Sequence, residues 1–189
     1  MKKILGFTMV ATLLACGGGG NKPDLSSQVQ HANGPDWVYR SSGAFGSDKG
    51  KVFYGVGIAS GIRNAGMRRS TSEARARSEI TRVLDNYASI LSKDYKPSTS
   101  ASDGKDASEK QRLEQALKDY SQSERSSVQI IDHWVDNDGN EYALASLPLE
   151  RFKGDMERMK ELDAETRDAV RAGADNAFDE LSAEEAKQR

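Results

Sequence analysis

Residues 51–59 show the clearest pattern of apolar and polar positions along the chain. They are mostly β-branched, aromatic or glycine residues, and they are flanked by glycines, which predicts a strand. The side chains on one face of this strand are mostly small, so we expect another element of the fold to pack closely against that face. The bulky face consists of Val52, Tyr54, Val56 and Ile58, and the other face of Phe53, Gly55, Gly57 and Ala59.

From about residue 64 to residue 92, the apolar residues recur at the spacing of a helix and no longer at that of a strand. Its apolar stripe consists of Ala76, Ile80, Val83, Leu84, Tyr87 and Leu91. A low-complexity loop at 96–107 precedes a shorter helix bearing Leu113, Leu117 and Tyr120. Strands predicted at 126–136 and 141–147 flank Asn137-Asp138-Gly139-Asn140, whose Asp-Gly step indicates a hairpin.

The last forty residues are helical in composition, but their apolar stripe weakens after Leu162. We therefore expect a helix that packs on the domain at first and then projects, or pairs with another chain. The predicted fold class is α+β, with a small antiparallel sheet of about three strands, one hairpin, covering helices and a long C-terminal helix. The domain is expected at 35–152 and a helical extension at 153–189.

The amino terminus has the order of a secretory signal: Lys2 and Lys3, then an apolar run from Ile4 to Leu14. That run is too short to span a bilayer, which needs about 20 apolar residues. It ends in Leu13-Leu14-Ala15-Cys16, which resembles the bacterial lipobox. We expect a signal peptide at 1–15 and lipid attachment at Cys16, against the alternative of a secreted protein with a stray cysteine.

Cys16 is the only cysteine, so neither an internal disulfide nor a thiolate metal cluster can form. Two or more acyl chains on its sulfur would give stable anchoring to a membrane. Residues 16–34 are poor in apolar side chains and predict a disordered tether with a reach of about 20–25 Å. Gly17 is not the aspartate that signals inner-membrane retention, which favours the outer membrane, on its periplasmic face or at the cell surface.

Several segments together with the lipobox resemble the LPP-twenty lipoprotein family, over about residues 35–152. They are Pro35-Asp36-Trp37-Val38, the strand at 53–59, the Ala/Arg/Ser-rich helix at 72–80, Trp134-Val135-Asp136-Asn137-Asp138-Gly139 and Tyr142-Ala143-Leu144-Ala145. The resemblance implies helices on a small antiparallel sheet and a non-enzymatic outer-membrane or surface lipoprotein. Some relatives form rings or disks around the flagellar motor.

Candidate chemistry is sparse. Gly55-Val56-Gly57 with Gly61 could be a dinucleotide-binding turn, but close helix packing explains the same glycines. The acidic residues around His133 and Gly139 do not fit the register of an EF-hand loop. The other histidine, His31, falls in the tether, so no nucleophile has a base beside it. We expect no enzyme activity, cofactor, metal or small-molecule substrate.

The formal net charge of −2, with both signs mixed throughout, argues against nucleic-acid binding. Arginines crowd the first long helix, where Arg69, Arg75 and Arg77 could contact an anionic envelope polymer. Glu73, four residues before Arg77, favours instead a self-neutralising face. Two hypotheses follow: an envelope structural subunit that self-associates or joins envelope proteins, and a module that binds peptidoglycan or lipopolysaccharide.

Overall fold

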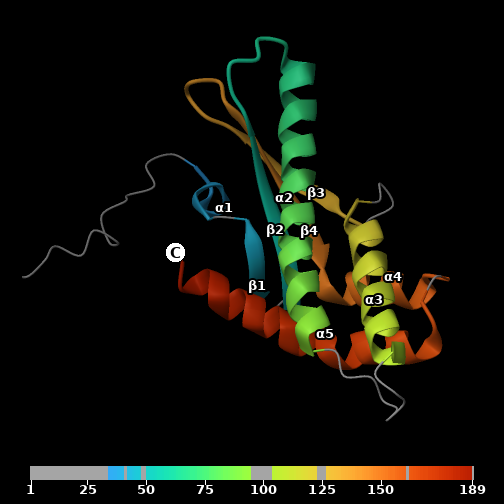
Figure 1. Ribbon diagram of the computed structural model, residues 1–189. Coiled ribbons are helices and arrows are strands. Elements are labelled where there is room, and N and C mark those ends of the chain that lie inside the picture. The colour runs from blue at the N-terminus through green and yellow to red at the C-terminus, as the bar shows by residue number, and fades with distance from the viewer. Residues whose placement is uncertain are drawn as a thin grey trace, which may run out of the picture. The chain divides into compact units, whose positions relative to one another are not determined.

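A four-stranded antiparallel sheet lies at the centre of the fold (Figure 1). Its strands, in spatial order, are β1 (Gly43–Ser47), β2 (Gly50–Ala59), β4 (Glu141–Pro148) and β3 (Gln129–Val135). The helices are α1 (Asp36–Tyr39), α2 (Ala65–Asp94), α3 (Gly104–Gln122), α4 (Leu149–Arg158) and α5 (Ala164–Ala186). The α+β class, the antiparallel sheet and the long C-terminal helix are confirmed.

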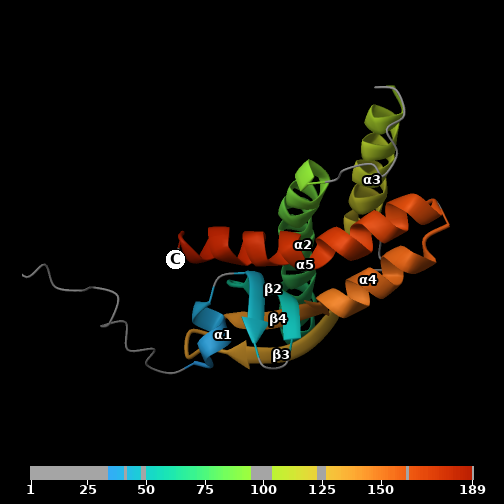
Figure 2. The same ribbon diagram turned by 90° about the horizontal axis from the view of Figure 1, so that it is seen from below.

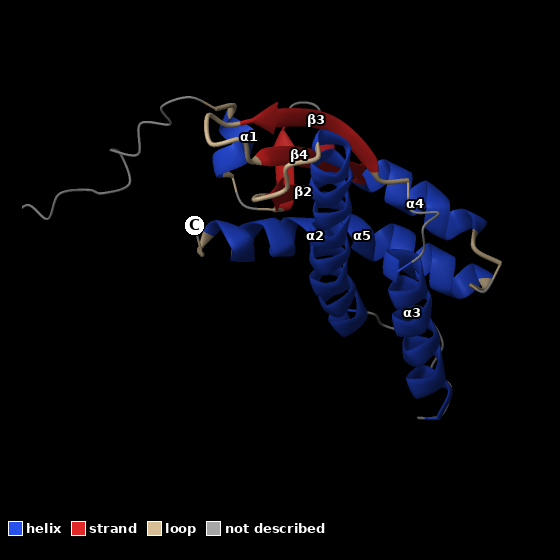
Figure 3. Ribbon diagram, turned by 90° about the horizontal axis from the view of Figure 1, so that it is seen from above, coloured by secondary structure: helices blue, strands red, loops and turns tan. Residues whose placement is uncertain are grey.

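The structure is a computed structural model that describes residues 34–40, 42–47, 50–94, 104–122, 127–160 and 162–188. All of these fall within one compact unit, His31–Arg189. Figure 3 shows α2 and α5 on one side of the strands and α1 close to β3 and β4. Among the residues that the structure describes, long helices therefore cover one face of the sheet, and only the single turn of α1 lies on the other.

The expected count of about three strands is wrong, because β1 precedes β2 and pairs with it in a hairpin. The segment Gly43-Ala44-Phe45-Gly46-Ser47 has one bulky apolar residue, so its own composition gives little β signal. Its inner residue, Ala44, is nevertheless fully buried beside Phe53 of β2. Pairing with a strong neighbouring strand, and not local propensity, makes this segment extended.

The small face of β2 packs directly against the backbone of α2, as its glycines predicted. A Cβ atom built on Gly55 would lie 2.3 Å from the carbonyl oxygen of Ala76, and one on Gly57 would lie 2.2 Å from the Ala76 amide nitrogen. Only glycine permits this approach. Close helix packing therefore accounts for the glycines, and the antiparallel sheet offers no parallel strand for a dinucleotide-binding unit.

Five aromatic rings from five elements meet in the core between the sheet and the helices. The ring of Phe53 lies 5.1 Å from those of both Tyr87 and Phe178, measured between centroids. Phe152 lies 5.3 Å from Tyr87 and 5.2 Å from Tyr120, both edge-to-face. Such pairs contribute beyond their buried area, so this cluster ties β2, α2, α3, α4 and α5 into one core.

The loop expected at 96–107 ends earlier than predicted, because α3 begins at Gly104. Residues 95–103 lie outside the described part of the chain. Leu113, Leu117 and Tyr120 are buried as their spacing predicted. The helix therefore extends one turn into the low-complexity segment, where no apolar residue marked its beginning.

The expectation that the C-terminal helix projects from the domain is wrong, whereas its pairing with another chain stays a prediction. The chain breaks after α4, and Asp163 caps α5 by accepting a hydrogen bond from the Thr166 amide at 2.8 Å. Figure 2 shows α5 crossing α2. The buried positions of α5 are Thr166, Val170, Ala174, Ala177, Phe178 and Leu181. The break changes the direction of the chain, so the later stripe buries itself in the same core as residues 35–152.

Candidate functional surfaces

The predicted lipid attachment site, Cys16, and the cleavage residues Leu13, Leu14 and Ala15 lie outside the described residues. Their roles stay predictions from the sequence. Within the part that the structure describes, no helix combines the length and apolarity needed to cross a bilayer.

Two of the three candidate polymer-binding arginines share one carboxylate on α2. Arg69 donates from Nε to Oε1 of Glu73 at 3.4 Å, and Arg77 Nη1 lies 3.6 Å from the other oxygen. His133 of β3 completes the cluster, since its Nε2 lies 3.0 Å from Oε1 of Glu73 and its Nδ1 lies 3.2 Å from Arg69. The helical spacing predicted the pair with Arg77, but sequence reasoning missed His133.

This cluster changes the acidity of Glu73. Partial burial by itself would raise the pKa of this carboxyl group, but the hydrogen bond and charge of His133 oppose that effect. Together with Arg69 and Arg77 they hold the pKa of Glu73 below its ordinary value. Glu73 is therefore a carboxylate at neutral pH, and it offsets much of the positive charge around it.

The third candidate, Arg75, donates from Nη1 to the carbonyl oxygen of Ile58 at the end of β2. The three arginines therefore do not converge on one point: two meet at Glu73 and the third is attached to the sheet. A self-neutralising surface describes this geometry better than a polymer-binding patch does.

The acidic residues around the β3–β4 turn serve the turn itself. Asp136 accepts hydrogen bonds from the amides of Asp138 at 3.0 Å and Asn140 at 2.8 Å, and Gly139 adopts a φ of 79°. These bonds lower the pKa of Asp136, the side chain of Asn140 contributing most. Among the described residues, no group of three or more histidine, cysteine or acidic side chains could hold a metal ion. The predicted hairpin is confirmed.

The open face of the sheet, on the side away from α2, carries an apolar groove of about 240 Å³. Its lining includes Trp37 of α1, Phe45 of β1, Tyr54 and Val56 of β2, Ile131 of β3 and Leu144 of β4. The bulky face predicted for β2 forms the floor of this groove. The sequence pattern did not reveal the groove, because its walls come from α1, from β1 and from a bulge in β3 between Ile130 and Asp132.

The indole of Trp37 fixes α1 to this face by donating from Nε1 to Oδ2 of Asp132 at 2.8 Å. Gly34, two residues before α1, lies beside the ring of Trp134, since a Cβ atom there would be 3.1 Å from it. Trp134 in turn packs on Tyr142, with ring centroids 5.2 Å apart. The described chain therefore begins on the open face of the sheet.

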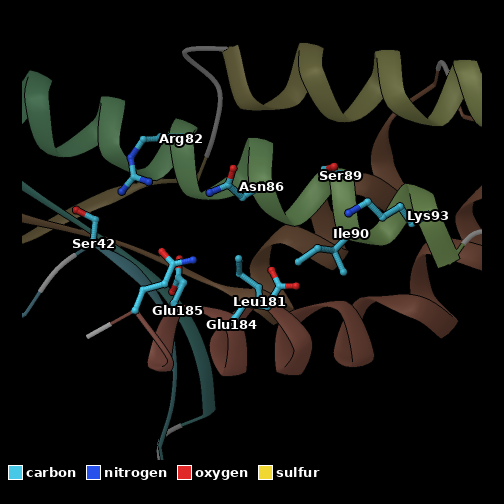
Figure 4. Close-up of a pocket in the computed structure, with 10 residues that line it drawn as sticks. Ser42, Arg82, Asn86, Ser89, Ile90, Lys93, Leu181, Glu184 and Glu185 are labelled. Carbon is cyan, nitrogen blue, oxygen red and sulfur yellow. The ribbon is translucent and has the colours of Figure 1, made fainter.

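A second cleft, of about 430 Å³, lies between α2 and α5 (Figure 4). Arg82 and Lys93 of α2 and Glu184 and Glu185 of α5 project toward it, so it has charges of both signs. Several of its polar groups stabilise the framework: Arg82 pairs with Glu79 at 2.9 Å, and Glu185 accepts from the amide of Ala44 at 2.8 Å. No single ligand charge is favoured by this mixture.

The comparisons with known proteins place the chain in no established group. No family model matches the sequence, and a search of the curated proteins finds no match. The resemblance to the LPP-twenty lipoproteins therefore stays a prediction that rests on the segments quoted above.

Proposed function

We propose that this chain is a lipid-anchored protein of the bacterial outer membrane with a structural or assembly role. The observation that carries the proposal is the motif Leu13-Leu14-Ala15-Cys16 at the end of a short apolar run that follows two lysines. Acyl chains on Cys16 would hold the protein at the membrane, and the unit His31–Arg189 would act beside it.

The described side chains support a structural role because their charged groups are engaged with one another. His133, the single histidine of the described residues, lies between Arg69 and Glu73. Lys153 pairs with Glu150 and Asp175, and Arg171 with Glu157. The carboxylate of Asp155, which accepts from the Ser127 hydroxyl at 2.7 Å, also accepts from Tyr120 and Arg158, so this group too is engaged in the framework.

Assembly would use the outer edge of β3. The opposite edge of the sheet is capped, because the amide of Ala44 in β1 donates to Glu185 of α5. Sheet edges offer backbone groups to another chain, and Val135 of β3 adds a side chain that is 46% exposed. Many copies tethered to one membrane would also meet at a high effective concentration.

Lipid attachment is tested on the native protein by mass spectrometry after expression in a two-membraned bacterium. We expect cleavage before Cys16, a mass increased by acyl groups, and recovery in the outer-membrane fraction. The Cys16→Ala variant should lose the acyl mass and leave that fraction. A mature chain with an unmodified thiol, or one that keeps its leader, contradicts the proposal.

Assembly is tested by chemical cross-linking of the anchored protein in native membranes. We expect discrete oligomers that become weaker in Val135→Lys, because an edge lysine opposes strand pairing. The control is Met67→Lys, which adds the same charge at an exposed apolar position on α2. Monomers alone at high copy number would refute the assembly role and leave lipid anchoring intact.

Binding to peptidoglycan or lipopolysaccharide through Arg69, Arg75 and Arg77 is the alternative function. A polymer would have to displace Glu73 and the carbonyl oxygen of Ile58 from these arginines. A pull-down with purified sacculi, and a second with lipopolysaccharide, decides the question. Binding lost on replacement of the three arginines by alanine would support this alternative; no binding to either polymer would reject it.

A further inference from the structure

We propose that the open face of the sheet rests on the lipid surface to which Cys16 is attached. This face comprises α1, Phe45, the bulky side of β2, the bulge of β3 and the outward side chains of β4. The proposal rests on the lipid anchoring proposed above and adds an orientation to it. The sheet would lie against the membrane, and α2 and α5 would face away from it.

Exposed apolar and aromatic side chains distinguish this face. Ile131 is 50% exposed, Tyr39 42% and Ile58 38%, and the groove beside them is lined mainly by apolar side chains. Tryptophan and tyrosine side chains favour the boundary between headgroups and acyl chains, because each has an apolar ring with a polar group. A bilayer surface is therefore a suitable environment for these residues.

The point at which the chain enters the domain lies on the same face. Residues 17–33 connect Cys16 to Gly34, which lies beside the ring of Trp134. Even fully extended, a connection of this length spans no more than about 60 Å. The chain that leads to the proposed anchor is therefore joined to the domain on the open face, and tethering raises the effective concentration of the domain at the membrane.

The charges at the groove are compatible with anionic headgroups. The guanidinium of Arg40 lies 5.9 Å from the centroid of the Phe45 ring, so it places a cation at the edge of the groove. The carboxylate of Asp132, which accepts a hydrogen bond from Trp37, lies nearby, so the surface around the groove has side chains of both charge signs. By contrast, the exposed side of α2 presents arginines paired with Glu73 and Glu79. Moving these charged groups from water to a lipid surface would be unfavourable.

The two tryptophans of the chain, Trp37 and Trp134, both lie on the open face, so their fluorescence reports directly on it. The assay uses the mature acylated chain in vesicles of phosphatidylcholine and phosphatidylglycerol, with and without bromine on the acyl chains. Bromine quenches tryptophan only at close range. We expect brominated lipid to lower the emission roughly twofold, as for rings placed at the acyl boundary.

A matched pair of variants shows which face makes the contact. Ile131→Glu places a charge on the open face and should abolish most of the quenching. Met67→Glu makes the same kind of change at a position that is 64% exposed on α2, and it should leave the quenching unchanged. Circular dichroism confirms that both variants are folded.

The possible failures are distinguishable. If the chain sediments with the vesicles but brominated lipid does not quench it, the proposed orientation is wrong and lipid anchoring stands. If the acyl groups are absent and the chain stays in solution, both proposals fail. If the emission is unquenched but shifts to the red when the number of chains per vesicle is lowered, a second copy covers this face, which also overturns the proposal.

Discussion

Replacing Gly57 by alanine should destabilise the protein strongly, although the change adds one methyl group. The new Cβ atom would lie 2.2 Å from both the Ala76 amide nitrogen and the Ser72 carbonyl oxygen of α2. A Cβ atom normally comes no closer than about 3.5 Å to a heavy atom to which it is not bonded, so α2 would have to move by roughly 1 Å. Both contacts are backbone atoms, which cannot rotate out of the way as a side chain can.

The loss of stability depends on the core side chains that α2 contributes. A shift of this helix displaces Ile80, Val83 and Tyr87, which are all at most 1% exposed in the core. Overpacking typically costs about 1–3 kcal/mol, and the backbone contact places this case near about 3 kcal/mol or above. For a domain of this size that corresponds to a fall in Tm of roughly 6–12 °C.

The measurement is urea unfolding of the mature chain, followed by circular dichroism. The matched control is Gly46→Ala in β1, where a Cβ atom would have nothing within 4 Å. That change should be neutral, or stabilise by up to about 1 kcal/mol through the unfolded chain. A loss for Gly57→Ala below about 0.5 kcal/mol, or equal to that of the control, would refute the close packing of α2 on β2.

Two further predictions concern α5. Phe178→Ala should lower the free energy of unfolding by about 3–5 kcal/mol, because Phe178 is buried in the aromatic core; a loss under about 1 kcal/mol in urea unfolding would mean that α5 does not pack there. The hydrogen bond from Lys153, aided by Lys51, keeps the pKa of Asp175 below its ordinary value. Its stabilisation is therefore complete above the pKa of the unfolded chain and is lost as pH falls through the lower folded pKa. Asp175→Asn should flatten the loss of stability below about pH 4 in acid unfolding curves, whereas the exposed Asp168→Asn should change it little; equal curves for the two variants would contradict the role of Asp175.

Sequence patterns predicted the elements whose own residues carry the signal. The alternation around Gly55 and Gly57 gave both the strand and its small face, and the stripe through Ile80 and Tyr87 gave the helix that covers it. The Asp138-Gly139 step gave the hairpin. In each case the periodicity of the backbone places apolar residues on one side, so the pattern is readable without the rest of the fold.

The elements that were missed depend on partners far away in the sequence. β1 is extended because it pairs with β2 and because Glu185, from the last helix, accepts a hydrogen bond from Ala44. The direction of α5 depends on the capped break at Asp163, which a continuous helical stripe does not reveal. Neither feature leaves a periodic signal in its own segment.

On the candidate surfaces too, contacts within one element could be predicted from the sequence, whereas contacts between elements could not. The pair of Glu73 with Arg77 could be predicted from helical spacing, but His133 reaches the same carboxylate from another element. The groove is also lined by side chains from different elements, namely Trp37 of α1, Phe45 of β1 and Ile131 of β3. Which side chains meet across elements depends on strand order and on a bulge, and neither is encoded locally.

The sequence alone defined the lipobox-like motif at Cys16, the α+β class and the main strand and helix, because these depend on residue order and on short-range periodicity. Only the tertiary structure decided that α5 belongs to the core and that, among the described residues, α1 alone lies on the other face of the sheet. The physical reason is that burial is a property of the whole chain: an apolar side chain becomes core or surface according to what other segments place against it.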